Sequence, residues 1–165
     1  MIDIIEQLEA LYGTPKETST RKVATKMVPV YRRWVERSRF CILSTVGPEG
    51  TDASPRGDDG SVVTVIDAKT LAMPDWRGND RIDSLRNIIR DPRLALMFMV
   101  PGSTNVVRVN GRGKIVADAE MLERFQRGRA LPRSVILIAI DEVYFQCSRA
   151  IMRSRLWSDD GDADG

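Results

Sequence analysis

The sequence predicts a mainly β protein, a closed or partly open antiparallel β-barrel with flanking helices. Three observations predict this fold class. From residue 39 onward, short segments of strand-like composition alternate with turn-forming residues. Most of these segments follow one another as an antiparallel meander with a single inserted helix, which disfavours a βαβ arrangement. The length of 165 residues suits one compact domain with a buried core.

Two helical regions are expected ahead of the strands. Residues 2–12 repeat apolar side chains at helical spacing, and Gly13 and Pro15 follow in the order that ends a helix. A second region runs from about residue 19 to residue 37, and Pro29 inside it predicts a break or a kink. We expect these helices and the barrel to form one domain over residues 1–157.

Strand-like segments make up most of the remaining chain. Residues 61–67 and 70–75 are separated only by Ala68 and Lys69, which predicts a hairpin. Residues 105–118 contain two glycines, as in a strand that bulges or coils at a barrel corner. The whole set predicts roughly six strands and comprises residues 39–46, 51–56, 61–67, 70–75, 93–100, 105–118 and 134–147.

The composition excludes several classes of protein and of chemistry. Hydrophobic content of 42% and charged content of 29% disfavour a disordered chain, and no apolar run reaches the roughly 20 residues of a membrane helix. The first residues lack the features of a secretory signal, and Cys41 and Cys147 have no metal-binding spacing, so we expect free thiols in the cytoplasm. Histidine is absent, which excludes His-dependent triads and common zinc sites, so redox chemistry would need an organic cofactor.

The net charge of +2 hides an asymmetry along the chain. Residues 158–165 contain four aspartates and are expected to form a disordered acidic tail, which leaves +6 on the rest. An arginine-rich body of this kind suits a phosphorylated ligand. The surplus is too small to indicate nucleic acid by itself.

The most informative stretch is "WRGNDRIDSLRNIIRDP", residues 76–92. A helix beginning near Asp80 would use that residue as its N-cap, with Asp83 in the first turn. It would place Ile82, Leu85 and Ile89 on one buried stripe.

The start of this helix gathers groups that bind anions. Free first-turn N–H groups, Arg81, Ser84 and Asn79 would converge there, and Gly78 would allow close backbone approach. A phosphate monoester is the ligand that this pattern favours. The alternative is a capped surface helix whose arginines are solvated or paired with aspartates.

Three other motifs leave alternatives open. "SPRGD", residues 54–58, positions Arg56 toward a ligand or forms an exposed loop. "NGRGK" contains Gly-x-Gly but completes no nucleotide-binding fingerprint. Residues 119–128 predict a short helix ending at Gly128, and residues 148–157 a turn or short helix. The arginines in and after residues 119–128 form either a nucleic-acid surface or a solvated helix face; they are Arg124, Arg127, Arg129 and Arg133. Met97 and Met99 are expected in the core.

The order of the segments resembles a known family. "FCILSTVGPEGTDASPRGD", "TLAMPDWRGNDRIDSLRNIIRDPRLALMFMVPG", "VRVNGRGKI" and "YFQCSRAIMRSRLW" together resemble the pyridoxamine 5′-phosphate oxidase-like, FMN-binding split-barrel superfamily. Within it they are most similar to a bacterial branch of FMN-dependent enzymes that begin with an "LEALYGTP"-like helix. The resemblance spans about residues 8–157, and "SPRGD" and "GNDRIDSLRNI" are its most specific parts.

The resemblance implies a six-stranded antiparallel split barrel and a homodimer with FMN in clefts between the subunits. The implied function is an FMN-dependent oxidoreductase that acts on an unknown small molecule. The implied cofactor-binding residues fall into groups: Asn79, Arg81 and Ser84 on the phosphate; Arg56 near the phosphate or ribityl chain; Gly57, Asp58, Val63, Met73 and Pro74 beside the isoalloxazine; and Arg108, Arg153 and Trp157 from the partner chain. Neither nucleic acid nor a membrane is an expected partner.

Two departures from the family limit the functional prediction. Gln146 stands where the branch is expected to have histidine, and the C-terminal segment that shapes the vitamer pocket in pyridoxamine-phosphate oxidases is shortened. Pyridoxamine-phosphate oxidation is therefore not supported. The alternatives are a non-catalytic flavin or deazaflavin carrier and a regulatory dimer; haem is disfavoured because histidine is absent.

Overall fold

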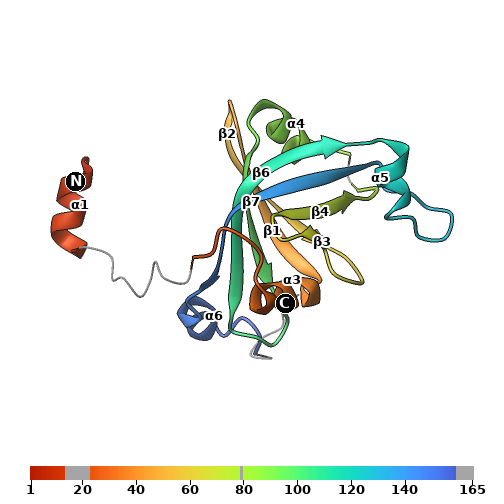
Figure 1. The fold of residues 1–165 in the computed structure, drawn as a ribbon. Helices are drawn as coiled ribbons and strands as arrows, with labels where there is room; N and C mark the ends of the chain where they lie inside the picture. The colour runs from red at the N-terminus through yellow and green to blue at the C-terminus, as the bar shows by residue number, and fades with distance from the viewer. Residues whose placement is uncertain (14–22, 79, 159–165) are drawn as a thin grey trace, which may run out of the picture.

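The protein is a single antiparallel sheet that curls into a barrel, with helices around it (Figure 1). The computed structural model describes residues 1–13, 23–78 and 80–158. The strands, in the order β2-β1-β5-β6-β7-β4-β3, confirm the predicted fold class. There are seven rather than six, because every predicted segment pairs: β1 Phe40–Gly47, β2 Gly50–Gly57, β3 Thr64–Asp67, β4 Thr70–Asp75, β5 Arg93–Met99, β6 Val106–Val116 and β7 Ser134–Gln146.

The core lies inside the barrel and is built from alternate residues of each strand. In β5, Leu96 and Phe98 point inward and are fully buried. Met97 between them is half-buried on the outer face, where it pairs with Ile42 of β1. The expectation that Met97 and Met99 both belong to the core is therefore correct only for Met99.

The predicted bulge in the long strand is present. The pairing of β6 with β7 shifts register between Asn110 and Gly111. A Cβ at Gly111 would collide with the backbone carbonyl oxygen of Ala139 on β7. Glycine is thus required at this position, because the two backbones approach too closely for any side chain.

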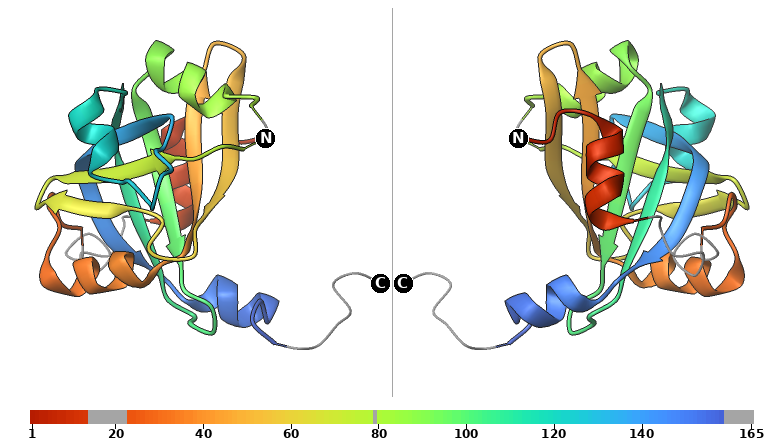
Figure 2. Two further views of the ribbon diagram at one scale, coloured as in Figure 1. Left: turned by 90° about the vertical axis from the view of Figure 1, so that its right-hand side faces the viewer. Right: turned by 90° about the vertical axis from the view of Figure 1, so that its left-hand side faces the viewer.

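The described residues form five helices: α1 Ile5–Tyr12, α3 Pro29–Arg37, α4 Asp83–Arg90, α5 Ala119–Glu123 and α6 Arg149–Ser154. Figures 1 and 2 show α3 and α4 at opposite ends of the barrel, with α4 beside β2. α1 ends at Gly13 as predicted, in a left-handed conformation that favours glycine. No helix of the described residues is long and apolar enough to cross a membrane.

Two helix predictions were wrong in extent. α3 begins at Pro29 instead of bending there, because proline at the first helical position loses no hydrogen bond. Residues 23–28 are not helical, and Ala24 forms a β-bridge with Val143. α5 ends at Glu123, whereas Gly128 lies in a tight turn. Residues 14–22 and 159–165 lie outside the described residues, so the acidic tail stays a prediction.

Candidate functional site

Side chains join edge strand β2 to β4, near the opposite edge of the sheet, and we call this junction the seam. β2 and β4 lie far apart in the strand order, yet Arg56 Nη1 lies 2.9 Å from Asp75 Oδ1. The side chains are only 26% and 14% exposed. The ion pair therefore joins strands that have other backbone partners.

A cavity of about 540 Å³ opens at this seam, within the roughly 300–1,000 Å³ typical of ligand pockets. It lies between the inward face of β2, the end of β4, the start of α4 and the start of β7. Predicted residues Arg56, Arg81 and Ser84 all line it. The remaining lining residues are Asp52, Ala53, Ser54, Pro55, Asp75, Trp76, Gly78, Asp80, Ile82, Asp83, Leu85, Arg133 and Ser134.

Strand alternation explains how β2 contributes to the cavity. Asp52, Ser54 and Arg56 occupy every second position, and they pair with the inward-facing side of β1. These side chains are half-buried, while the residues between them are exposed. Sequence reasoning singled out only Arg56; the alternation of polar residues in "TDASPR" is the signal that would have identified the other two.

The start of α4 differs from the prediction in a way that favours ligand binding. The helix begins at Asp83, and its N-cap is Ile82, which makes no side-chain capping hydrogen bond. Asp80 is not the cap, because its carboxylate accepts a hydrogen bond from Arg133 at 2.6 Å. The first turn of α4 thus faces the cavity without an acceptor from its cap, and this arrangement attracts anions.

The backbone on both sides of Arg81 is strained. Asp80 has φ 59° and Ile82 has φ 53°, in the left-handed region. This conformation is rare for a β-branched residue and costs about 1–3 kcal/mol. Such strain is found at ligand-binding positions, and it fixes how Arg81 leaves the chain at the cavity edge. A Cβ at Gly78 would meet nothing within 4 Å, so close approach does not require that glycine.

α4 packs on the sheet through polar and apolar contacts, and its predicted stripe is correct only in part. Ser84 Oγ donates to Asp52 Oδ2 at 3.0 Å, and Asn87 Nδ2 donates to Thr45 Oγ1 at 3.1 Å. The helix turns its Ser84 and Ile88 side inward, and Leu85 packs against the core as predicted. Ile82 is exposed and Ile89 is 75% exposed, so the prediction of a buried stripe was wrong for these two residues.

The charges of the cavity are nearly balanced. The guanidinium groups of Arg56, Arg81 and Arg133 are each paired with a carboxylate, from Asp75, Asp83 and Asp80 respectively. With Asp52 included, four carboxylates face three guanidinium groups among the described lining residues. Pairing of Arg81 with Asp83 is the alternative that the sequence left open. Arg81 remains 77% exposed, however, so solvent weakens that pair.

Two buried donors in the cavity lining lack an acceptor. Arg56 Nε and Trp76 Nε1 have no hydrogen-bond partner, although both atoms are shielded from solvent. Buried polar groups without a partner are uncommon and unfavourable in native proteins. A ligand that offers hydrogen-bond acceptors, such as a phosphate or a flavin ring, fits these two residues.

The Arg127–Asp58 ion pair packs against Trp76. Arg127 lies over the indole ring, 4.5 Å from its centroid, and donates to both carboxylate oxygens of Asp58 at 2.8 and 2.7 Å. Hydrogen bonding to Arg127 holds the pKa of Asp58 below its usual range. Arg127 is thus a structural partner of Asp58 and Trp76, rather than part of a solvated helix face.

The other predicted site residues that the structure describes lie outside this cavity, and Asn79 is not among the described residues. None of the five residues expected beside the isoalloxazine lines it: Gly57, Asp58, Val63, Met73 and Pro74. Arg108 on β6 donates to Gln146 at 3.4 Å, Arg153 is exposed on α6, and Trp157 donates to the carbonyl of Ser103 at 2.7 Å.

A smaller hollow of about 360 Å³ adjoins the cavity and shares Asp52, Arg81 and Asp83 with it. Arg86 and Arg90 of α4 add positive charge there. No group of three or more His, Cys, Asp or Glu side chains within the described part of the chain is arranged to hold a metal ion.

Comparisons with known proteins agree with this fold. The family model for pyridoxamine 5′-phosphate oxidase matches residues 27–147. A candidate pyridoxamine 5′-phosphate oxidase from Lactobacillus delbrueckii is 21% identical with a TM-score of 0.59, over 73% of this chain and 95% of that chain. HupZ of Group A Streptococcus is 18% identical with a TM-score of 0.58, over 72% and 93%.

An FMN-binding protein from Syntrophomonas wolfei is 14% identical with a TM-score of 0.53, over 88% of this chain and 98% of that chain. At these identities the solved structures show a common fold only. No curated protein sequence matches the chain.

Proposed function

The chain belongs to the pyridoxamine 5′-phosphate oxidase family, and from this premise we propose that it is an FMN-dependent oxidoreductase that binds the flavin in the seam cavity. The observation that carries the proposal is the first turn of α4, which opens into the cavity beside Arg81 without a side-chain cap. A phosphate monoester is the ligand chemistry that suits such a helix start. When bound, FMN would supply hydride or single-electron transfer.

Each residue of the site has a defined role in this proposal. Arg81 turns from Asp83 to the phosphate; the exposed pair that it leaves is worth about 0–1 kcal/mol, less than a two-pronged arginine–phosphate contact. Ser84 orients the first turn through its bond to Asp52. Arg56 Nε and Trp76 Nε1 supply donors to the ribityl chain or the ring, because both atoms are buried and lack an acceptor.

We further propose that the active form is a homodimer. The outer face of the sheet carries half-buried Ile42 and Met97, next to exposed Pro55 on β2. The same row continues through Arg108 to Tyr144, whose ring lies 5.4 Å from the Arg108 guanidinium. An apolar outer face on an antiparallel sheet is typical of a protein interface. In the proposed dimer Arg108, Arg153 and Trp157 would reach the partner's flavin.

A second candidate is a flavin or deazaflavin carrier. Two observations favour it. The sequence has no histidine, the side chain that most readily donates a proton near neutral pH, and the described cavity arginines are paired with carboxylates. For either function we place the protein in the cytoplasm, where free Cys147 would stay reduced.

Purification and titration test the proposal. The protein should be yellow and release FMN, rather than FAD, on denaturation. Arg81→Ala should weaken FMN binding by about 1.5–3 kcal/mol, the size of a charged hydrogen bond. Arg37→Ala, at an exposed position of α3, is the matched control and should leave the dissociation constant unchanged. A colourless protein that micromolar FMN does not reconstitute would refute flavin binding. Turnover no faster than that of free FMN would favour the carrier.

A further inference from the structure

The N-terminal helix presents an apolar stripe that none of the described residues of its own chain covers. Ile5, Leu8 and Tyr12 are spaced to share one side of α1, and all three are exposed. α1 has no buried residue, and Figure 1 shows it standing apart from the barrel. An isolated helix of eight residues is marginal in water, because helices shorter than about 12–15 residues rarely persist alone. We therefore expect the apolar stripe of α1 to pack on another protein surface.

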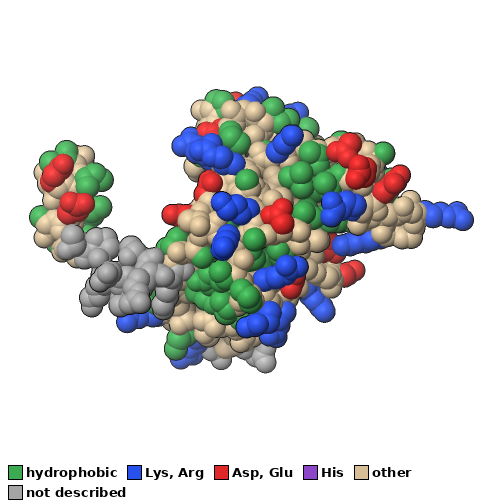
Figure 3. Space-filling view, in the orientation of Figure 1, with side chains coloured by type: hydrophobic (Ala, Val, Ile, Leu, Met, Phe, Trp, Pro, Cys, Tyr) green, Lys and Arg blue, Asp and Glu red, His purple; other side chains and the backbone are tan. Residues whose placement is uncertain are grey.

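The charge of this segment indicates what kind of surface it fits. Residues 1–13 contain Asp3, Glu6 and Glu9 and neither lysine nor arginine. Figure 3 shows α1 with hydrophobic and acidic side chains. A complementary surface would combine exposed apolar side chains with a cluster of positive charge.

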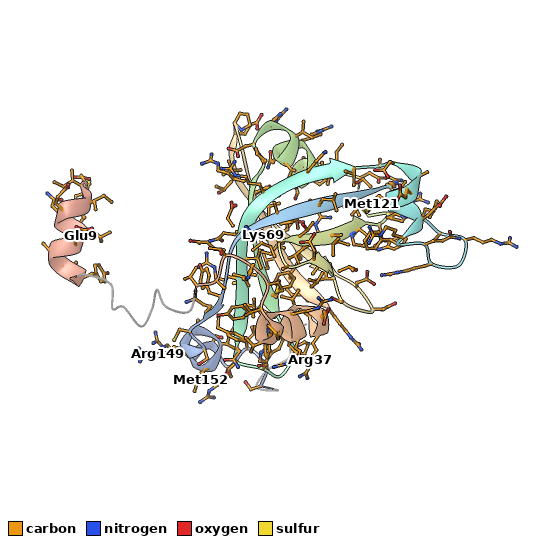
Figure 4. All side chains as sticks on the ribbon, in the orientation of Figure 1. Glu9, Arg37, Lys69, Met121, Arg149 and Met152 are labelled. Atoms are coloured by element: carbon orange, nitrogen blue, oxygen red, sulfur yellow. The ribbon has the colours of Figure 1, made fainter. Side chains whose placement is uncertain are left out.

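α6 and the residues after it form such a surface. Met152 and Leu156 are exposed, four positions apart, and Met152 is 61% exposed. Arg149, Arg153 and Arg155 accompany them, and residues 147–158 contain no acidic residue. Figure 4 shows Glu9 on α1 and Arg149 and Met152 on α6 toward the same side of the barrel, with Met121 of α5 on the opposite side.

We propose that α1 of one copy packs its Ile5–Leu8–Tyr12 stripe on the Met152–Leu156 surface of α6 in a second copy, with the acidic residues of α1 facing the arginines of α6. The inference rests on the homodimer proposed above. α6 follows directly on β7, whose Tyr144 belongs to the proposed dimer face, so the new contact is continuous with that face. A two-fold axis would make the contact twice, which doubles its effect on association.

Disulfide trapping between two different chains tests the proposal. Cys41 is buried, and Cys147→Ser removes the exposed native thiol. In that background, a chain with Leu8→Cys is mixed with a differently tagged chain with Met152→Cys and mildly oxidised. We expect a covalent heterodimer. Leu8→Cys mixed with Met121→Cys is the matched control and should give at least tenfold less product.

Charge exchange supplies a second readout. Glu9→Arg should lower the yield of the Leu8→Cys and Met152→Cys product several-fold, and Arg149→Glu in the other chain should restore it. Leu8→Asp should raise the dimer dissociation constant about tenfold to hundredfold, because it removes a leucine that the proposed contact would bury.

The outcomes separate this inference from the proposed function. A disulfide that forms only when Leu8→Cys and Met152→Cys are in the same chain would show that α1 covers its own α6 and would overturn the proposal. If the protein is a dimer but the yield of cross-linked heterodimer does not exceed that of the Met121→Cys control, the α1–α6 contact is wrong and the homodimer proposal stands. A monomer at all concentrations would overturn the homodimer as well. Colourless protein that cross-links as expected would leave the inference intact and refute only flavin binding.

Discussion

Changing either partner of the ion pair across the seam should lower the stability of the protein, whereas flavin affinity should change in opposite directions for the two partners. Arg56→Gln removes the guanidinium with its unpaired Nε–H donor, whereas Asp75→Asn removes one carboxylate and leaves the arginine in place. Asp75→Asn preserves side-chain size, and Arg56→Gln shortens the side chain. The pair joins β2 to β4 at 2.9 Å between Nη1 and Oδ1.

The burial of each partner sets the size of the effect on stability. Asp75 is 14% exposed, so Arg56→Gln leaves a largely desolvated carboxylate and should lower the free energy of unfolding by about 1.5–3 kcal/mol. Asp75→Asn leaves Arg56, which is 26% exposed, and should lower it by about 1–2 kcal/mol. The double variant should lose about 1 kcal/mol less than the sum, because the two changes break one interaction.

The effects on FMN affinity should differ in sign. Arg56→Gln should weaken binding about tenfold or more, because a charged hydrogen bond is lost. Asp75→Asn should strengthen binding a few-fold, because it lowers the number of lining carboxylates from four to three and frees Arg56 for the ligand.

Urea unfolding and fluorescence titration with FMN measure the two quantities independently. The exposed Arg32–Glu36 pair on α3, at 2.8 Å, is the matched control; breaking it should change unfolding by at most about 0.5 kcal/mol and leave FMN binding unaltered. If Asp75→Asn weakens FMN binding as much as Arg56→Gln does, the assignment of Arg56 as a cofactor ligand is wrong and the pair only ties the seam.

Three further predictions concern the rest of the molecule. Asp58→Asn should lower the free energy of unfolding at pH 7 by about 1–2 kcal/mol. Because its arginine partner lowers the pKa of Asp58, the stability advantage of the wild type should be complete well above pH 3.8 and should disappear as the pH falls below that value. Urea unfolding at several pH values measures this advantage. Burial raises the pKa of Cys41 from 9.0 to about 12, so the stability of the protein should decline between pH 9 and 12. At pH 8 a thiol reagent should label only Cys147 in the native protein and both cysteines after unfolding. Rapid labelling of both thiols in the native state would contradict this. Gly111→Ala should destabilise the protein by about 1–3 kcal/mol or more in thermal melts, since a Cβ would collide with a carbonyl of β7, whereas Gly60→Ala, with open space around it, should have little effect.

The strands were predictable because their signals are local. Alternation along residues 51–56, the Pro48-Glu49 turn and the two-residue link at Ala68 and Lys69 each specify structure within a few residues. The glycine-marked bulge at Gly111 was recognisable for the same reason, since only glycine allows that close approach.

The details of the site were not predictable because distant residues decide them. Asp80 has the composition of an N-cap, but Arg133, 53 residues later, takes its carboxylate. The buried side of α4 carries Ile88 and also Ser84, whose partner Asp52 lies 32 residues earlier, whereas Ile82 and Ile89 are exposed. Arg81 and Ser84 nevertheless line the same cavity, because they belong to one short segment, and their role in binding a phosphate stays a prediction.

The seam differs from the rest of the barrel wall in what holds it together. Among the described residues, β2 pairs in the sheet only with β1, and β4 lies between β7 and β3, so side chains rather than backbone hydrogen bonds join Arg56 to Asp75. Breaking this contact would cost about 1.5–3 kcal/mol, the size of a charged hydrogen bond, whereas separating paired strands would break several backbone hydrogen bonds at once. We therefore expect the barrel to open at the seam before any pair of strands separates.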